Sequence, residues 1–381
     1  MPARCAARVS STSAGHSLES TRARVVTLVP LPGQPEGSPW PAPDWAEGPI
    51  PRGVDLAPLL DAAFDAGGPL SLTYAVVVIH RGRLVAERYS GVIEHWDRAD
   101  EPVGPDTPLL SWSMAKSMLH AVVGVLVGER RVQTHAPAPV PQWAAPDDPR
   151  RTITLQDLLE MRDGLDFAED YVDARASDVI EMLFGAGKDD VAAFAADRPA
   201  IAAPGLRFNY SSGSSNIVSA IVDREVGFGD RYCRFLRERL FDPIGAQSAR
   251  PTLDAAGTWV ASSYVHATAR DFARFGYLYL RDGVWDGRRV LPDGWVDHGR
   301  RPRSVDPEDG SLYGAHWWVV GDGHGSFQAS GYEGQSILVC PGLDLVVVRL
   351  GKTPSDRYPQ LREWRAAVTA AFAAGDAILG G

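Results

Sequence analysis

A single lysine lies in a stretch that otherwise carries no charged residue, residues 109–128 (LLSWSMAKSMLHAVVGVLVG). The stretch contains no Asp, Glu or Arg, and His120 is its only other titratable side chain. A helix that is apolar on all sides is a buried helix, so we expect a central helix that begins near residue 112. A buried amine is costly unless it is paired or neutral. Lys116 is one of only three lysines in the chain, against 35 arginines.

The sequence Ser113-Met114-Ala115-Lys116 is an S-x-x-K motif. On a helix, residues i and i+3 lie on one face, so the hydroxyl of Ser113 and the amine of Lys116 are expected side by side. Desolvation favours the neutral amine, which can take the hydroxyl proton. A serine near a helix N-terminus also gains from the partial positive charge there, and its backbone N–H can donate to an oxyanion. The ordinary alternative is a lysine whose amine reaches water.

Two later segments carry candidate partners for this pair. The segment NYSSGSSN (209–216) contains Tyr210, in the only Y-x-[S/N] sequence of the chain. A tyrosine beside an amine can act as a base or relay protons; the alternative is an ordinary loop tyrosine. In SFQASGYEGQ (326–335), a predicted strand ends at Gly331. Glycine lets the backbone approach a ligand, and the N–H of Tyr332 can act as a second oxyanion donor; the alternative is a simple β-turn.

Composition excludes several classes of function. The net charge of −10 and the absence of a basic block argue against a nucleic-acid partner. Three widely spaced cysteines, Cys5, Cys233 and Cys340, give neither a disulfide framework nor a metal-binding pair. Nine scattered histidines without H-E-x-x-H predict no metal and no cofactor. No segment has the ~20 apolar residues of a membrane span, and none has the length of a signal peptide. We expect a cytoplasmic protein with no membrane partner.

The order of the predicted elements indicates an α+β fold. Eight prolines between residues 30 and 51 predict an extended N-terminal segment over 1–50, disordered over roughly its first 20 residues. Strands joined by tight turns predict an antiparallel sheet. The expected elements are a helix at 54–67, a hairpin at 73–89, a helical block over 109–285, strands within 316–350 and a last helix at about 357–375.

Together these segments resemble the β-lactamase and penicillin-binding serine hydrolase superfamily. The resemblance covers about residues 55–375 and is greatest to the class-C-like esterase and 6-aminohexanoate-oligomer hydrolase branch. It includes ITLQDLLEMRDGLDFAEDY (153–171), PGLRFNYSS (204–212), SSYVHATARDFARFG (262–276) and ASGYEGQSILVCPGLDLVVV (329–348). The resemblance implies an antiparallel sheet flanked by N- and C-terminal helices, with an inserted all-helical domain. Residues 51–381 would form the hydrolase domain, with its α/β part at about 51–108 and 286–381 and its helical part at about 109–285.

The resemblance also implies roles for individual residues. Ser113 would be the acylated nucleophile, Lys116 and Tyr210 would share the acid and base steps, and the N–H groups of Ser113 and Tyr332 would form the oxyanion hole. Tyr171, in AEDYVDA, matches a tyrosine that helps protonate the amide nitrogen in the 6-aminohexanoate branch; an ordinary surface tyrosine is the alternative. Adjacent strand residues face opposite ways, so one of two neighbouring tryptophans can line the pocket. The expected pocket residues are Tyr171, Trp318, Ser330 and Gly331.

The chain departs from the superfamily at one informative place. Lactam-binding members carry K-T-G or H-T-G on the pocket strand, where the cation holds the substrate carboxylate. The matching triplet here is Ala329-Ser330-Gly331, which has no cation. The resemblance therefore implies hydrolysis of small-molecule carboxylic esters or small amides through an acyl-enzyme, by a monomer or homodimer. The alternatives are a β-lactamase or D,D-peptidase, and a catalytically silent penicillin-binding-like binding module.

Overall fold

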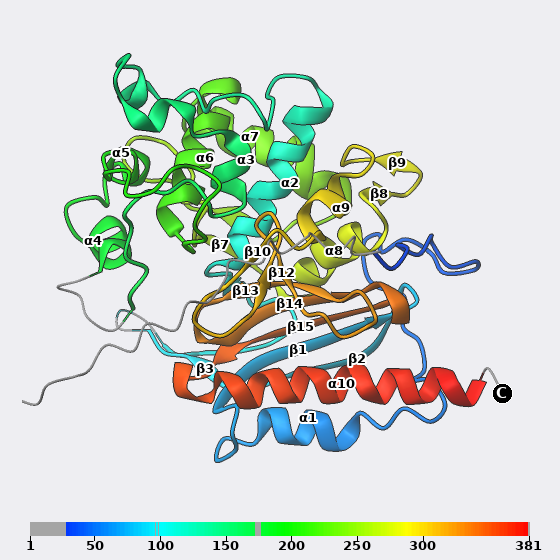
Figure 1. Cartoon of the computed structure of the whole chain (residues 1–381). Helices are drawn as coiled ribbons and strands as arrows, with labels where there is room; N and C mark the ends of the chain where they lie inside the picture. Colours follow the sequence, from blue (N-terminus) through cyan, green and yellow to red (C-terminus); the bar gives the residue numbers. More distant parts are fainter. Residues whose placement is uncertain (1–27, 96, 98, 172–176, 380–381) are drawn as a thin grey trace, which may run out of the picture.

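Runs of β-branched residues form the middle of one antiparallel sheet of eight strands (Figure 1). The computed structural model describes residues 28–379 except 96, 98 and 172–176, so Cys5 and the expected N-terminal disorder lie outside the described residues. The antiparallel sheet and the 73–89 hairpin are both confirmed. In spatial order the strands are β10 (Ser304–Val305), β11 (Leu312–Tyr313), β12 (Trp318–Val319), β13 (Phe327–Gly331), β14 (Gln335–Cys340), β15 (Leu345–Lys352), β1 (Leu72–His80) and β2 (Arg83–Tyr89).

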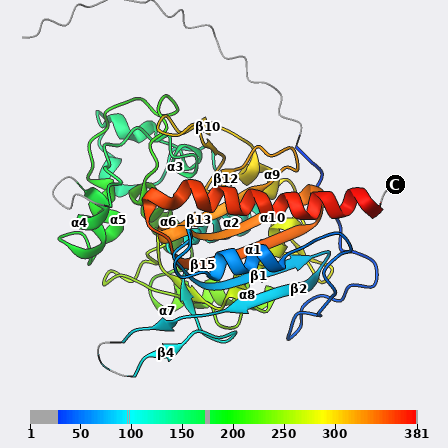
Figure 2. The same cartoon turned by 90° about the horizontal axis from the view of Figure 1, so that it is seen from below.

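Both faces of the sheet are covered, which explains why its central strands are continuously apolar. The helices α1 (Ala57–Phe64) and α10 (Tyr358–Leu379) lie side by side on one face (Figures 1 and 2). Val76 and Val78 of β1 join the core beneath these helices, whereas Val77 joins the larger core on the opposite face. This alternation is the period of two expected of a strand.

The opposite face carries α2 (Met114–Gly128) and α8 (Ala269–Leu280), behind which the helical region is built. The helix α8 packs very closely on the sheet, since a Cβ added at Gly276 would lie 2.6 Å from Ile337 Cγ2. The expected apolar helix is α2, in which every residue from Met114 to Leu126 is buried. The remaining helices are α3 (Leu155–Leu159), α4 (Asp178–Phe184), α5 (Val191–Ala196), α6 (Ser212–Val226), α7 (Asp230–Leu236) and α9 (Trp295–Arg300).

Short strands are where the structure differs from the predicted elements. Two- and three-residue strands are too short to show a period in the sequence, and the region read as helical contains several of them. The strand expected over 316–320 is only β12, because His316 adopts a positive φ of 55° and ends the extended run. The short strands are β3 (Val92–Ile93), β4 (Glu101–Pro102), β5 (Leu109–Leu110), β6 (Arg250–Pro251), β7 (Val265–Ala267), β8 (Val284–Trp285) and β9 (Arg288–Arg289).

The proline-rich segment before α1 runs along the edge of the sheet. Glu47 forms a parallel bridge with Leu84 of β2. Trp45 is buried, and its ring meets that of Tyr277 on α8 edge to face at 5.3 Å. The segment thus covers an edge strand whose backbone would otherwise be open to pairing. No helix in the described part of the chain is long and apolar enough to cross a membrane.

Candidate active site

The chain makes a strained turn just before α2. Trp112 has a positive φ of 45°, which is rare for a bulky residue and is typical of functional sites. The turn is held by Ser111, whose N–H donates to the carbonyl of Val265 (2.8 Å) and whose hydroxyl accepts from the Val265 N–H (3.0 Å). As a result Ser113 lies at the first turn of a buried helix and is only 8% exposed.

The amine of Lys116 is buried against three oxygen atoms. Its Nζ lies 2.9 Å from Ser113 Oγ, 3.0 Å from Ser212 Oγ and 2.9 Å from the carbonyl of Ser262. Burial lowers the pKa of Lys116 to about 8, while the charge of Glu169 acts in the opposite direction. A tenth or so of this amine is therefore neutral at pH 7, far more than for a lysine in water.

The partners of the amine determine where its lone pair points. The hydroxyl of Ser212 donates to Glu169 Oε1 (2.5 Å), and the Ser212 N–H donates to Oε2 of the same carboxylate (2.7 Å). With its proton used in this way, Ser212 Oγ can only accept from Lys116, and the Ser262 carbonyl can only accept. Both N–H groups of a neutral amine are then used, and the lone pair faces Ser113 Oγ.

Tyr210 is brought to the same hydroxyl from the start of α6. Lys116 Nζ lies 4.9 Å from the centre of the Tyr210 ring. Burial, followed by the charge of Glu169, raises the pKa of Tyr210 well above its ordinary value. The group is therefore a neutral phenol at pH 7. Its ring packs against Trp318 (5.4 Å between centroids) and Tyr313 (5.9 Å).

The end of β13 lies directly against the turn that carries the serine. A Cβ added at Gly331 would lie 2.5 Å from the carbonyl oxygen of Ser111, so only glycine fits there. The ring of Tyr332 meets Trp112 edge to face at 5.5 Å and stacks on Tyr171 at 5.0 Å. The hydroxyl of Ser330 is buried and has no hydrogen-bond partner among the described residues.

The structure thus brings Ser113 and Lys116 into hydrogen-bonding contact and places the ring of Tyr210 beside the amine. Sequence reasoning missed Glu169 and the orienting roles of Ser212 and Ser262. Ser212 stands inside the Tyr210 motif, and Glu169 stands two residues before Tyr171, but only the fold shows that they meet.

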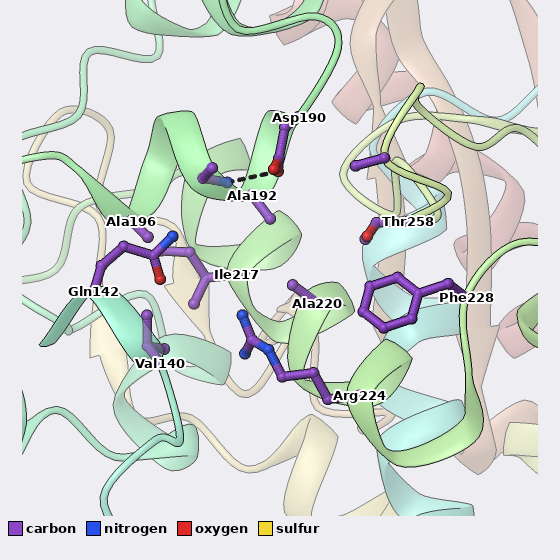
Figure 3. A pocket seen from close by; sticks show the side chains of 12 residues that line it. Val140, Gln142, Asp190, Ala192, Ala196, Ile217, Ala220, Arg224, Phe228 and Thr258 are labelled. Carbon is purple, nitrogen blue, oxygen red and sulfur yellow. Dashed lines mark hydrogen bonds between the residues drawn. The ribbon is translucent and has the colours of Figure 1, made fainter. Parts of the chain in front are cut away.

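A hollow lies on another face of α6, away from the serine (Figure 3). Its volume is about 90 Å³, and Ile217, Ala220 and Arg224 of α6 line it. Its two charged side chains already have structural partners: the Asp190 carboxylate accepts from the Ala193 N–H, and Arg224 donates to the carbonyl of Pro139. This hollow shares no residue with the serine site.

Comparison with known proteins shows the family of the chain. The profile of the family described as Beta-lactamase matches residues 70–371. The 6-aminohexanoate-dimer hydrolase of Paenarthrobacter ureafaciens is 32% identical in an alignment 300 residues long that covers 73% of each chain.

Solved structures share the fold at lower identity. A family VIII carboxylesterase superposes with a TM-score of 0.65 at 16% identity, over 85% of this chain and 99% of that one. The octameric penicillin-binding protein homologue from Pyrococcus abyssi gives a TM-score of 0.64 at 18% identity, over 83% and 77%. The resemblance drawn from the sequence motifs is confirmed: this protein belongs to the Beta-lactamase family and is a serine hydrolase.

Proposed function

We propose that the protein hydrolyses carboxylic esters or small amides through an acyl-enzyme on Ser113. The observation that carries the proposal is the hydrogen-bond pattern around Lys116. Since Ser212 and the Ser262 carbonyl use both N–H groups of the neutral amine, its lone pair is directed at Ser113 Oγ, 2.9 Å away. A depressed pKa and a fixed lone pair are the two requirements of a general base.

In the proposed acylation step, the proton of Ser113 moves to Lys116 while Ser113 Oγ bonds to the substrate carbonyl carbon. The resulting oxyanion is stabilised by the backbone N–H groups of Ser113 and Tyr332. The tetrahedral intermediate then collapses, and the bond from carbon to the leaving oxygen or nitrogen breaks. Water then attacks the acyl carbon and gives a proton to Lys116. The bond from that carbon to Ser113 Oγ breaks, the proton passes from Lys116 to Ser113, and the acid is released.

Tyr210 is proposed as the proton donor to the leaving group. Its raised pKa makes it a neutral phenol, which suits a donor better than the phenolate base considered from sequence. It gives its proton to the departing nitrogen or oxygen and is reprotonated from Lys116. Tyr171 is a further candidate proton donor for amides. In this structure its hydroxyl donates a hydrogen bond to Glu169.

The proposed substrate class follows from the walls of the site. The triplet Ala329-Ser330-Gly331 offers no cation for a substrate carboxylate, and aromatic rings line the approach. The relative from Paenarthrobacter ureafaciens is named for an amide dimer, and one structural neighbour is a carboxylesterase. Esters and small amides without a required carboxylate fit best.

A fluorophosphonate probe followed by intact-mass spectrometry tests the proposal. We expect one adduct on Ser113 in the wild type and none in Ser113→Ala. Folded wild-type protein that stays unlabelled, or a Ser113→Ala variant that is labelled equally, would overturn it; equal labelling would favour the binding-module alternative.

Substrate choice is tested with a series of p-nitrophenyl esters of increasing chain length, set beside linear and cyclic amides and nitrocefin. We expect turnover of esters or amides well above that of nitrocefin. Comparable turnover of nitrocefin would favour the β-lactamase alternative.

A further inference from the structure

Arg349, on the central strand β15, is a fully buried guanidinium. Burying a charge is costly unless its hydrogen-bonding groups are satisfied, so its partners are informative. Among the described residues none of these partners is a carboxylate. Its hydrogen bonds run to the carbonyls of Leu70 (3.1 Å), Leu72 (3.1 Å), Glu333 (3.2 Å) and Gly334 (3.3 Å) and to Thr73 Oγ1 (3.0 Å).

These partners belong to two separate pieces of the chain. Leu70, Leu72 and Thr73 lie at the entry to β1, whereas Glu333 and Gly334 belong to the short turn Tyr332–Gly334 that follows β13. A Cβ added at Gly334 would lie 3.0 Å from Arg349 Nη1, which shows how closely the guanidinium approaches the turn backbone. The arginine therefore ties this turn to the core of the sheet.

The turn needs such support because its backbone is strained. Glu333 has φ 58° and ψ 20°, a left-handed conformation that residues other than glycine rarely adopt. Its N–H donates to the hydroxyl of Tyr358 (3.0 Å), and its carbonyl accepts from the Thr353 N–H (2.9 Å) as well as from Arg349. The carbonyl of Tyr332 accepts from Gln335 Nε2 (3.0 Å). Each peptide group of the turn after the Tyr332 N–H is thus held by at least one of these hydrogen bonds.

The front of the same turn faces the serine. Gly331 lies against the backbone of Ser111, and the Tyr332 ring packs on Trp112, the residue before Ser113. We propose that Arg349 is a positioning residue for the oxyanion hole: it fixes the Tyr332–Gly334 turn so that the Tyr332 N–H points at the carbonyl that Ser113 attacks. This inference rests on the proposed function. A preorganised donor acts only if its direction is set before the charge develops.

The experiment compares a p-nitrophenyl ester with its thiono analogue, in which sulfur replaces the carbonyl oxygen. Sulfur is a weak hydrogen-bond acceptor, so the oxygen ester benefits more from an intact oxyanion hole. In Arg349→Met we expect kcat for the oxygen ester to fall about 100-fold, the size of one lost oxyanion donor. The kcat for the thiono ester should fall much less. The ratio of kcat for the oxygen ester to kcat for the thiono ester should therefore drop, while KM changes little.

Tyr358→Phe is the second variant, since Arg349→Met can fail to fold. It removes only the acceptor of the Glu333 N–H from a half-buried side chain, and we expect a smaller drop of the same ratio. Arg281→Met is the matched control: Arg281 is buried too, but it pairs with Asp344. It should lower stability and leave the ratio unchanged.

The outcomes separate the two claims. Wild-type protein without ester turnover or Ser113 labelling would remove the proposed function itself. Wild-type turnover with an unchanged ratio in the folded variants, Tyr358→Phe included, would overturn the positioning role of Arg349. If the ratio falls equally in Arg281→Met, the ratio reports general destabilisation. This outcome would also overturn the positioning role of Arg349.

Discussion

The two regions around Lys116 and Arg349 each contain a buried cation, but they hold it differently. Lys116 Nζ contacts two serine hydroxyls and one carbonyl, whereas Arg349 donates to four carbonyls and one threonine hydroxyl. Burial lowers the pKa of both groups, to about 8 for Lys116 and to about 9 for Arg349. Similar burial therefore does not by itself define the role of a cation.

The partners make the difference. An ammonium is a compact charge that shifts its pKa readily and can give up a proton, whereas a guanidinium is a rigid fork of donors that stays protonated. A hydroxyl can donate or accept, so Ser113 can pass its proton to Lys116. Carbonyls only accept, so the four carbonyls at Arg349 each require a donor, which the guanidinium supplies. One environment allows proton transfer, and the other fixes geometry.

Replacing each cation by methionine should reveal the largest difference between the two regions. In Lys116→Met we expect kcat/KM for an ester to fall about 10,000-fold, the upper range for a general base. Its stability should change much less than that of Arg349→Met, because the removal of a desolvated amine offsets the loss of one donor to the Ser262 carbonyl. In Arg349→Met we expect a loss of about 3 kcal/mol or more, because several buried carbonyls lose their donor. Urea unfolding and ester turnover measure both; equal destabilisation by the two changes would contradict the contrast.

Tyr210→Phe tests the proton transfer that the region around Lys116 is proposed to carry out. We expect the rate on an amide to fall about 100-fold or more, because the leaving nitrogen loses its acid. A p-nitrophenyl ester, whose leaving group needs no proton, should be affected less. Stopped-flow or steady-state rates on the two substrates give the ratio. An equal loss on both would assign Tyr210 to positioning Ser113 rather than to protonating the leaving group.

Local sequence was enough to predict that Ser113 and Lys116 lie together in a buried helix, and the reason is physical. Ser113 and Lys116 are one helical turn apart, and the charge-free run around them shows their burial. The sheet and its covering helices were likewise predictable, since each long strand or helix shows its own period. Two-residue strands show none.

The orienting groups were not predictable because their contacts join distant parts of the chain. Lys116 meets Ser212 across 96 residues and Ser262 across 146. Arg349 meets Leu70 across 279 residues, and its strand reads simply as a buried β run. Such partners follow from tertiary packing, and no local pattern encodes them.

A half-buried histidine, His298 of α9, tests whether desolvation also governs protonation behind α2. His298 shares hydrogen bonds with His120 (3.0 Å) and Gln156 (2.9 Å). Burial, with the charge of Arg303 as a smaller cause, lowers its pKa to about 4. Its folded pKa lies below the unfolded value of about 6.5, so its contribution to stability is full above pH 6.5. It is lost as pH falls toward 4, by about 3 kcal/mol.

His298→Asn isolates this contribution by difference. Asp163 and Asp223 have pKa values raised to about 6 by burial and act in the opposite direction, so the wild type alone mixes both effects. The variant should be less stable than the wild type at pH 7, and the gap should close by about 3 kcal/mol at pH 4. Urea unfolding at several pH values measures the gap. A constant gap would mean that His298 titrates normally.

The smallest effect, and the finest test of the contrast, is expected from Glu169→Gln. The charge of Glu169 raises the pKa of Lys116, so its removal should move the acid limb of kcat/KM to lower pH. The limb reports a base that works when deprotonated, so activity falls below the pKa and levels off above it. The plateau of kcat/KM should fall roughly tenfold at most. The amide oxygen of the new side chain still accepts from the Ser212 hydroxyl, whereas its NH2 group faces the Ser212 N–H and cannot accept from it.

Tyr171→Phe is the control for that shift, since it removes the other hydroxyl bonded to Glu169 and leaves the carboxylate in place. Its limb should stay where the wild-type limb lies, near pH 8. A pH profile on a p-nitrophenyl ester shows both variants without a demand for leaving-group protonation. If Glu169→Gln leaves the limb in place while the plateau drops, Glu169 acts only by orienting Ser212. Burial alone then lowers the pKa of Lys116, whereas at Arg349 the charge of Arg365 adds to the effect of burial, and the hydrogen-bond partners remain the main difference between the two cations.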